Sequence, residues 1–144
     1  MPFLEYLHYL SIEQSSMENT FKMIASPKSP EINGDIEKGT LSIKGKSLPE
    51  DAKALYSEFK NWLDQFYKSE APEINVSIEL EYYNTVSSKL LLAILNELNN
   101  LKAKRKIEVE WRYDKDDIEM EETGDDFKKL VGDMIVLKPL EMDT

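Results

Sequence analysis

The sequence predicts a single α/β domain in which a mixed sheet carries its helices mainly on one face. Apolar and polar residues alternate along residues 74–82 and 107–113, which is typical of strands with one wet face. Apolar residues recur every three or four positions along residues 52–66 and 91–101, which is typical of helices that bury one side. Because helices and strands take turns along the chain, the strands that they join are expected to be parallel.

The first half of the domain is predicted to contain a hairpin and a helix. Residues 31–36 and 40–44 are two short strand candidates on either side of a turn that contains Gly39. In the helix that follows, Ser47 is the predicted N-cap, and Glu50, three residues later, completes a capping box.

The second half is predicted to repeat a strand and a helix. The expected order is a strand at 74–82, a helix through the leucines at 91–101, a strand at 107–113, a helix at 116–129 and a strand at 133–137. Strands covered on both faces are continuously apolar, whereas these two clear strands alternate. We therefore expect one sheet face to remain exposed or available to a partner, and it would carry Asn75, Ser77, Glu79, Glu108 and Arg112.

Composition restricts the classes of function. The chain has 144 residues, 41% of them apolar, which is enough for one domain with a real core. We expect residues 1–26 to form an N-terminal appendage and linker and residues 27–144 to form the domain. A net charge of -10 argues against nucleic-acid binding, because the phosphate backbone would be repelled. The lack of cysteine and of a long apolar run predicts a cytoplasmic protein that does not bind a membrane.

The sequence offers little for catalysis. Its only histidine, His8, lies in the expected appendage, and no glycine-rich phosphate loop or nucleophile motif is present. The acidic cluster at residues 114–126 could hold a divalent metal, but its spacing does not match the calcium-binding loop, and its acids suit the first turn of a helix. We predict no catalytic residue, no cofactor and no metal site.

The turn that follows residues 74–82 is the most informative feature. Asn84, Thr85 or Ser87 could each cap the next helix, yet four of the five residues at 84–88 are polar, more than a cap requires. The turn also follows the carboxyl end of a parallel strand, where α/β sheets present functional loops. A phosphoryl group there would be tolerated by the helix N-terminus while changing the surface charge drastically.

Three motifs resemble the SiaC-type regulatory phosphoproteins of bacteria, which are related in fold to the anti-sigma-factor antagonists (STAS domains). The motifs are Gly45-Lys46-Ser47-Leu48-Pro49-Glu50, Tyr82-Tyr83-Asn84-Thr85-Val86-Ser87-Ser88-Lys89, and Trp111-Arg112-Tyr113-Asp114 with the acidic segment up to Phe127. The similarity runs from about Pro30 to Phe127. It implies a single STAS-like domain that is controlled by reversible phosphorylation.

The resemblance also implies partners and sites. A partner kinase would phosphorylate Thr85, and a PP2C-type phosphatase would remove the phosphate. The unphosphorylated form would bind and activate an output protein such as a diguanylate cyclase, in cyclic-di-GMP signalling. The expected partner-binding residues are Tyr83, Asn84, Val86, Ser87, Ser88 and Lys89, of which Asn84 and Ser87 would also shape the turn.

Other interpretations stay open on the sequence alone. Ser87 or Ser88 could be the phosphoacceptor instead of Thr85, because all three hydroxyls lie at the same helix start. The chain could also be a constitutive protein-binding module that is never phosphorylated. A third possibility is a metal-dependent enzyme that uses the acidic cluster at residues 114–126.

Overall fold

A computed structural model of the chain describes residues 19–142. The elements follow in the order β1 (Thr20–Met23), β2 (Glu31–Asp35), β3 (Thr40–Ser47), α2 (Ala52–Tyr67), β4 (Glu73–Tyr83), α3 (Thr85–Leu101), β5 (Lys106–Asp114), α4 (Ile118–Val131) and β6 (Ile135–Leu140). The predicted hairpin, followed by alternating helices and strands, is confirmed.

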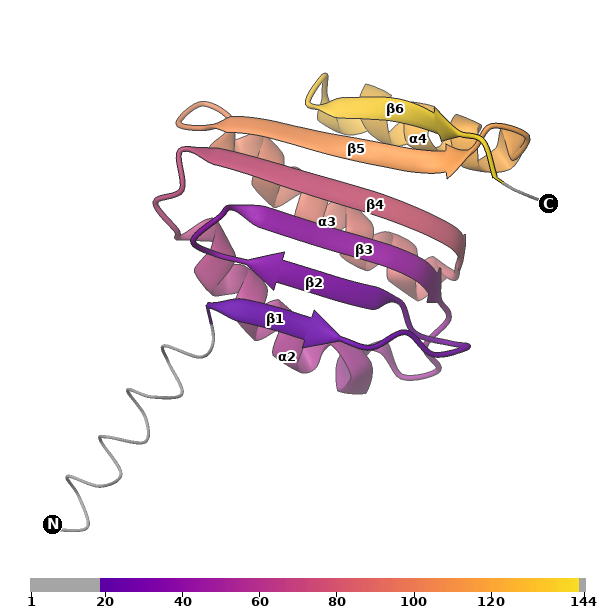
Figure 1. Ribbon diagram of the computed structural model, residues 1–144, viewed down its shortest axis with the longest axis horizontal. Helices are drawn as coiled ribbons and strands as arrows, with labels where there is room; N and C mark the ends of the chain where they lie inside the picture. Colours follow the sequence, from indigo (N-terminus) through magenta and orange to yellow (C-terminus); the bar gives the residue numbers. More distant parts are fainter. Residues whose placement is uncertain (1–18, 143–144) are drawn as a thin grey trace, which may run out of the picture.

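The six strands form one mixed sheet in the order β1-β2-β3-β4-β5-β6 (Figure 1). β2 pairs antiparallel with both β1 and β3, whereas β3, β4, β5 and β6 are parallel to one another. The carboxyl ends of the four parallel strands therefore meet at one edge of the sheet, which we call the carboxyl edge. Because α2, α3 and α4 follow β3, β4 and β5 directly, all three helices begin at this edge.

All three helices cover the same face of the sheet (Figure 1). Along β4, the alternate residues from Ile74 to Leu80 are at most 5% exposed. On α2, Phe59 and Phe66 are fully buried. The hydrophobic core thus lies between one sheet face and the helices, and the predicted one-sided layering is confirmed.

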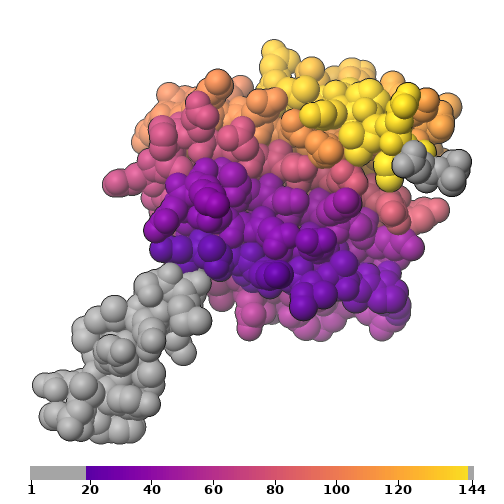
Figure 2. Space-filling model, viewed as in Figure 1, coloured from indigo at the N-terminus to yellow at the C-terminus, as the bar shows by residue number. Residues whose placement is uncertain are grey.

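The opposite sheet face remains open, and Figure 2 views the molecule from this side. The five polar residues predicted for it are all accessible: Asn75 and Glu108 are exposed, and Ser77, Glu79 and Arg112 are half-buried. A groove of about 710 Å³ crosses the face from β1 to β5.

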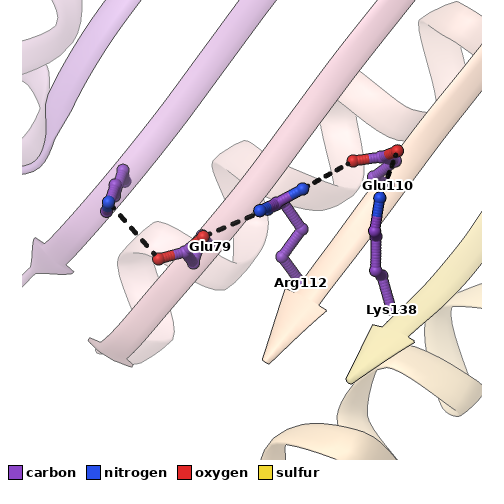
Figure 3. A network of polar contacts seen from close by, with 5 residues as sticks. Glu79, Glu110, Arg112 and Lys138 are labelled. Atoms are coloured by element: carbon purple, nitrogen blue, oxygen red, sulfur yellow. Dashed lines mark hydrogen bonds and ion pairs between the residues drawn. The ribbon is translucent and has the colours of Figure 1, made fainter. Parts of the chain in front are cut away.

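An ion-pair ladder crosses the open face over β3 to β6 (Figure 3). Arg112 Nε donates to Glu79 Oε1 at 3.1 Å, and Arg112 Nη1 donates to Glu110 Oε2 at 3.0 Å. Lys44 Nζ lies 3.7 Å from Glu79 Oε2, and Lys138 Nζ lies 3.4 Å from Glu110 Oε1. Positive and negative groups thus alternate across four neighbouring strands.

The structure contains a strand that the sequence does not predict, and it lies within the expected appendage. Residues 20–23 form β1, which pairs with β2 at the edge of the sheet. Phe21 faces α2, with its ring centroid 5.2 Å from that of Phe59 and 6.0 Å from that of Trp62. Four residues are too few for a convincing period-two pattern. The rest of the expected appendage, residues 1–18, lies outside the described residues.

α2 begins later than predicted. Asp51, not Ser47, is its N-cap, and the Asp51 carboxylate accepts a hydrogen bond from Ala54 N at 3.1 Å. Ser47 is the last residue of β3 and is only 3% exposed. Glu50 forms an ion pair with Lys28, with 2.9 Å between Lys28 Nζ and Glu50 Oε1. The predicted capping box is therefore wrong, because the Ser47 side chain turns into the core and Glu50 toward solvent.

The acidic segment forms α4, as predicted for residues 116–129, with its start moved to Ile118. Asp117 is the N-cap and accepts from Met120 N at 3.1 Å. Two glutamates lie in the first turn and two lysines in the last, so the charges suit the helix dipole. β6 begins two residues later than the predicted strand and extends to Leu140.

Candidate functional site

The turn between β4 and α3 lies at the carboxyl edge of the sheet. Asn84 is the N-cap of α3, with extended φ and ψ of -92° and 176°. Its Oδ1 accepts a hydrogen bond from Ser87 N at 3.0 Å, and this satisfies one of the free N–H groups of the first helical turn. Of the three residues that could cap the helix, the structure selects Asn84.

Thr85 is the first residue of α3, and its side chain is exposed to solvent. Lys89, one turn further along the helix, is also exposed, and Val86 is 47% exposed. Ser88 and Tyr83 are half-buried. The predicted site residues around Thr85 therefore reach the surface together.

Ser87 does not belong to this surface. It is 1% exposed, and its Oγ donates toward Ser47 O at 2.9 Å and toward Asn84 Oδ1 at 2.8 Å. A side chain that is sealed in this way cannot contact a partner or receive a phosphoryl group without local unfolding. The expectation of Ser87 as a partner-binding residue or alternative acceptor is therefore wrong, whereas its expected role in shaping the turn matches these bonds.

The polar groups of Asn84 all have partners. Its backbone N–H donates to Ser47 O at 3.0 Å, and its backbone carbonyl accepts from Ser88 N at 3.0 Å. Its side-chain Nδ2 donates to Pro49 O at 3.0 Å, which joins the turn to the loop between β3 and α2. Asn84 therefore holds three segments in one arrangement, and this leaves little freedom to the backbone beside Thr85.

A groove of about 340 Å³ lies beside Thr85, between the start of α3 and α4. Its lining residues are Tyr83, Asn84, Thr85, Ser88, Thr123, Asp126, Phe127 and Leu130. Leu130 is 72% exposed, so an apolar side chain stands at the wall of the groove. The α4 residues of this groove are not among the site residues that the sequence predicts. Their spacing of three and four places them on one helix face, but only the fold turns that face toward Thr85.

Electrostatics on the α4 side of this groove are negative. Burial raises the pKa of Tyr83, a hydrogen bond with Thr123 partly offsets this effect, and the charge of Asp126 raises the pKa further. The Tyr83 hydroxyl is therefore neutral at physiological pH. Among residues 19–142, no lysine or arginine lines the groove.

The described part of the chain has neither a cluster of metal ligands nor a membrane-spanning helix. Between residues 19 and 142, no group of three or more histidine, cysteine, aspartate or glutamate side chains is arranged to hold a metal ion. Over the same residues, no helix has the length and apolar character needed to cross a membrane.

Comparisons with solved structures agree on the fold. The structure of apo-SiaC from Pseudomonas aeruginosa superposes with a TM-score of 0.75 and 24% identity, over 83% of this chain and 98% of that chain. SiaC from the same organism, solved in complex with the diguanylate cyclase SiaD that it activates, gives a TM-score of 0.77 and 24% identity, over 83% and 99%. At this identity the likeness shows the fold alone.

Comparisons at the sequence level show the family. An uncharacterised protein of Pseudomonas aeruginosa strain UCBPP-PA14 is 29% identical over 101 residues, which cover 69% of this chain and 80% of that protein. A family model described as SiaC family regulatory phosphoprotein matches residues 11–139, most of the chain and the whole of the turn and groove around Thr85. The chain therefore belongs to the SiaC family of regulatory phosphoproteins.

Proposed function

We propose that this protein is a switch whose partner binding is controlled by phosphorylation of Thr85. A partner kinase adds the phosphoryl group, and a PP2C-type phosphatase removes it. The observation that carries the proposal is burial: of the three hydroxyls in the turn, Thr85 is exposed, Ser88 is half-buried and Ser87 is sealed. Membership of a family of regulatory phosphoproteins supports it.

The surroundings of Thr85 suit a switch that works by charge. A phosphoryl group adds about -1.5 to -2 charges at neutral pH. On Thr85 it would stand at the helix N-terminus, which tolerates an anion, so the fold would remain intact. Asp126 lines the same groove, and within residues 19–142 no cationic side chain does, so much of the added charge would face an approaching partner.

The unphosphorylated form is proposed to bind and activate an output protein. Val86, the next residue of α3, and Leu130, in the wall of the groove, offer exposed apolar contacts, and Lys89 offers an exposed charged contact. The SiaC protein of the solved complex activates a diguanylate cyclase, and an output enzyme of this kind is the proposed partner here. In this proposal the chain performs no catalysis itself and acts in the cytoplasm.

The phosphorylation step is tested with the partner kinase and ATP. Intact mass should show one added phosphoryl group, and peptide mapping should place it on Thr85. Thr85→Ala should abolish the addition, whereas Ser88→Ala, the matched control in the same turn, should keep it. A phosphate that persists in Thr85→Ala would overturn the assignment.

The binding step is tested by the affinity for the output protein. Thr85→Asp should weaken binding about tenfold or more, because a charge enters a partly desolvated interface. The side chain in Thr85→Asn has nearly the same shape as that in Thr85→Asp but carries no charge. Its affinity for the output protein should therefore equal that of Thr85→Ala. Equal affinities for the Asp and Asn variants would argue against control by charge.

The open sheet face favours a second candidate, a constitutive protein-binding module. That face carries a groove of about 710 Å³, and its lining residues do not include Thr85, Ser87 or Ser88. In that case the kinase would add no phosphate, and Ser77→Arg in the middle of the sheet would abolish partner binding while Thr85→Asp would not.

A further inference from the structure

Three buried hydroxyls form a chain behind the turn that carries Thr85. The Tyr56 hydroxyl on α2 contacts Ser47 Oγ at the end of β3, and Ser47 Oγ lies 2.6 Å from Ser87 Oγ on α3. Tyr56, Ser47 and Ser87 are 2%, 3% and 1% exposed. This polar chain therefore runs through the core and joins three elements.

Counting protons gives the chain a direction. Ser87 Oγ lies 2.8 Å from Asn84 Oδ1 and 2.9 Å from Ser47 O, both of which can only accept, so its single proton is directed to them. Ser87 must then accept from Ser47 Oγ, and Ser47 must accept from Tyr56. Burial raises the pKa of Tyr56, an effect that the hydrogen bond with Ser47 partly offsets, so the phenol keeps the proton that it donates.

The chain ends on Asn84, the residue before Thr85. Asn84 Oδ1 receives both the Ser87 hydroxyl and the Ser87 backbone N–H, which aims its Nδ2 at Pro49 O. The orientation of the Asn84 amide is thus determined at both ends. A cap alone would need only the Ser87 N–H; the further bonds satisfy the buried Ser87 hydroxyl and at the same time fix the orientation of the Asn84 amide.

We propose that Asn84 is a positioning residue, oriented by the Tyr56–Ser47–Ser87 hydroxyl chain. It holds the backbone beside Thr85, and with it the Thr85 hydroxyl, in one place for phosphoryl transfer. Its own side-chain amide ties the turn to the β3–α2 loop. The inference rests on the proposed function, in which Thr85 is the acceptor. Phosphoryl transfer depends on placing the attacking oxygen in line with the phosphorus atom. A hydroxyl on the first residue of a helix reaches that position repeatedly only if the cap beside it does not move.

Two variants test the positioning. Tyr56→Phe removes the donor at the head of the chain and keeps the ring; Tyr67→Phe, on the same helix and outside the chain, is its control. Asn84→Ser keeps a capping oxygen but lacks the amide that binds Pro49; Asp117→Ser, the same exchange at the cap of α4, is its control. All are made in the full chain.

The first measurement needs no kinase. Hydrogen exchange of the Asn84 and Ser87 backbone amides, followed by NMR, should be about tenfold faster in Tyr56→Phe and Asn84→Ser than in the wild type. Amides in the middle of α3, such as Leu95, should be unchanged, and so should all of these amides in the two controls. Unchanged exchange at Asn84 and Ser87 in both test variants would overturn the proposal.

The second measurement separates positioning from stability. At a temperature well below the unfolding midpoint of every variant, kcat for phosphorylation should fall about tenfold in the test variants, while KM for the protein substrate stays within about twofold. Faster exchange with unchanged kcat would make the chain structural only and would overturn the positioning role. Absence of phosphate on wild-type Thr85 would instead refute the proposed function, whereas the exchange data would still report whether the chain holds the turn.

Discussion

Neighbouring hydroxyls of the same turn have opposite environments. Thr85 faces water at the start of α3, whereas Ser87, two residues later, points into the core and is 1% exposed. Residues two apart on a helix lie on different sides of it, so one turn can present one hydroxyl and bury another. The local chemistry of these residues is similar, and burial assigns them different roles.

A negative charge should therefore have opposite effects at the two positions. Thr85→Asp should raise the free energy of unfolding by about 0.3–1 kcal/mol, because a carboxylate in the first turn favours the helix dipole. Ser87→Asp should lower it by about 3 kcal/mol, since the carboxylate would be buried against the Ser47 carbonyl without a cation. Urea unfolding of both variants at pH 7 measures these changes. Equal values would show that Ser87 is not sealed in solution.

The position of α4 depends on one close contact. Trp111 on β5 is 1% exposed, and its indole N–H donates to Met120 O at 3.0 Å. Gly124 lies directly over this ring, where a Cβ atom would come within 2.3 Å of Trp111 Cδ1 and 2.6 Å of Leu137 Cδ2. The absence of a side chain at this residue lets α4 approach the sheet, and this brings Asp126 and Leu130 beside Thr85.

Gly124→Ala should therefore destabilise the protein, although alanine favours helices. The overlap costs about 1–3 kcal/mol, which exceeds the helix-propensity gain of about 1 kcal/mol. Glu122→Ala, at an exposed position of the same helix, is the control and should change stability by less than about 0.5 kcal/mol. Chemical unfolding, together with the near-ultraviolet signal of the tryptophans, measures both. A Gly124→Ala variant as stable as the wild type would contradict this packing.

At the scale of the whole molecule, ion pairs cross the open face of the sheet from β3 to β6. A hydrogen bond from Arg112 holds the pKa of Glu110 below its ordinary value, against a smaller opposing effect of desolvation, and Lys138 lowers it further. Hydrogen bonds to Glu79 and Glu110 raise the pKa of Arg112. The charged form of Glu110 is thus favoured in the folded state, so this residue couples stability to pH.

Because the folded pKa of Glu110 is depressed, its contribution should be present above the ordinary value of 4.5 and be lost as the pH falls through the lower folded value. Glu110→Gln should cost about 0.5 kcal/mol at pH 7, since the pair is partly exposed, and nothing in strong acid. Glu108→Gln is the control: Glu108 lies on the same face and has no ion pair within residues 19–142. Unfolding from pH 7 to 2.5 tests this; a pH-independent difference would contradict it.

Elements with many repeats of a clear period were predictable from the sequence. β4 and β5 show apolar alternation over nine or more residues, and α2 and α3 show helical spacing over four turns. β1 was not predictable, because its four residues gain order only from pairing with β2 and from the contact of Phe21 with α2. Short segments depend on partners that lie elsewhere in the chain.

The turn around Thr85 was predictable as a hydroxyl-rich helix start, but its internal division of roles was not. Asn, Thr and Ser are all good helix caps, so composition alone could not choose among them. Ser47 was predicted to cap α2 because the spacing of Ser47 and Glu50 fits a capping box. Its hydroxyl is instead used by Tyr56 and Ser87, which come from two other elements. Such contacts are set by packing and not by spacing.

The sequence by itself determined the order of strands and helices from β2 onward, the open polar face and the hydroxyl-rich turn at a helix start, because periodicity and capping act between near neighbours. Only the tertiary structure decided which hydroxyl is exposed, which residue caps α2 and which face of α4 stands beside Thr85. The physical reason is that burial and buried hydrogen bonds are properties of surfaces brought together by packing, and segments far apart in the chain supply those surfaces.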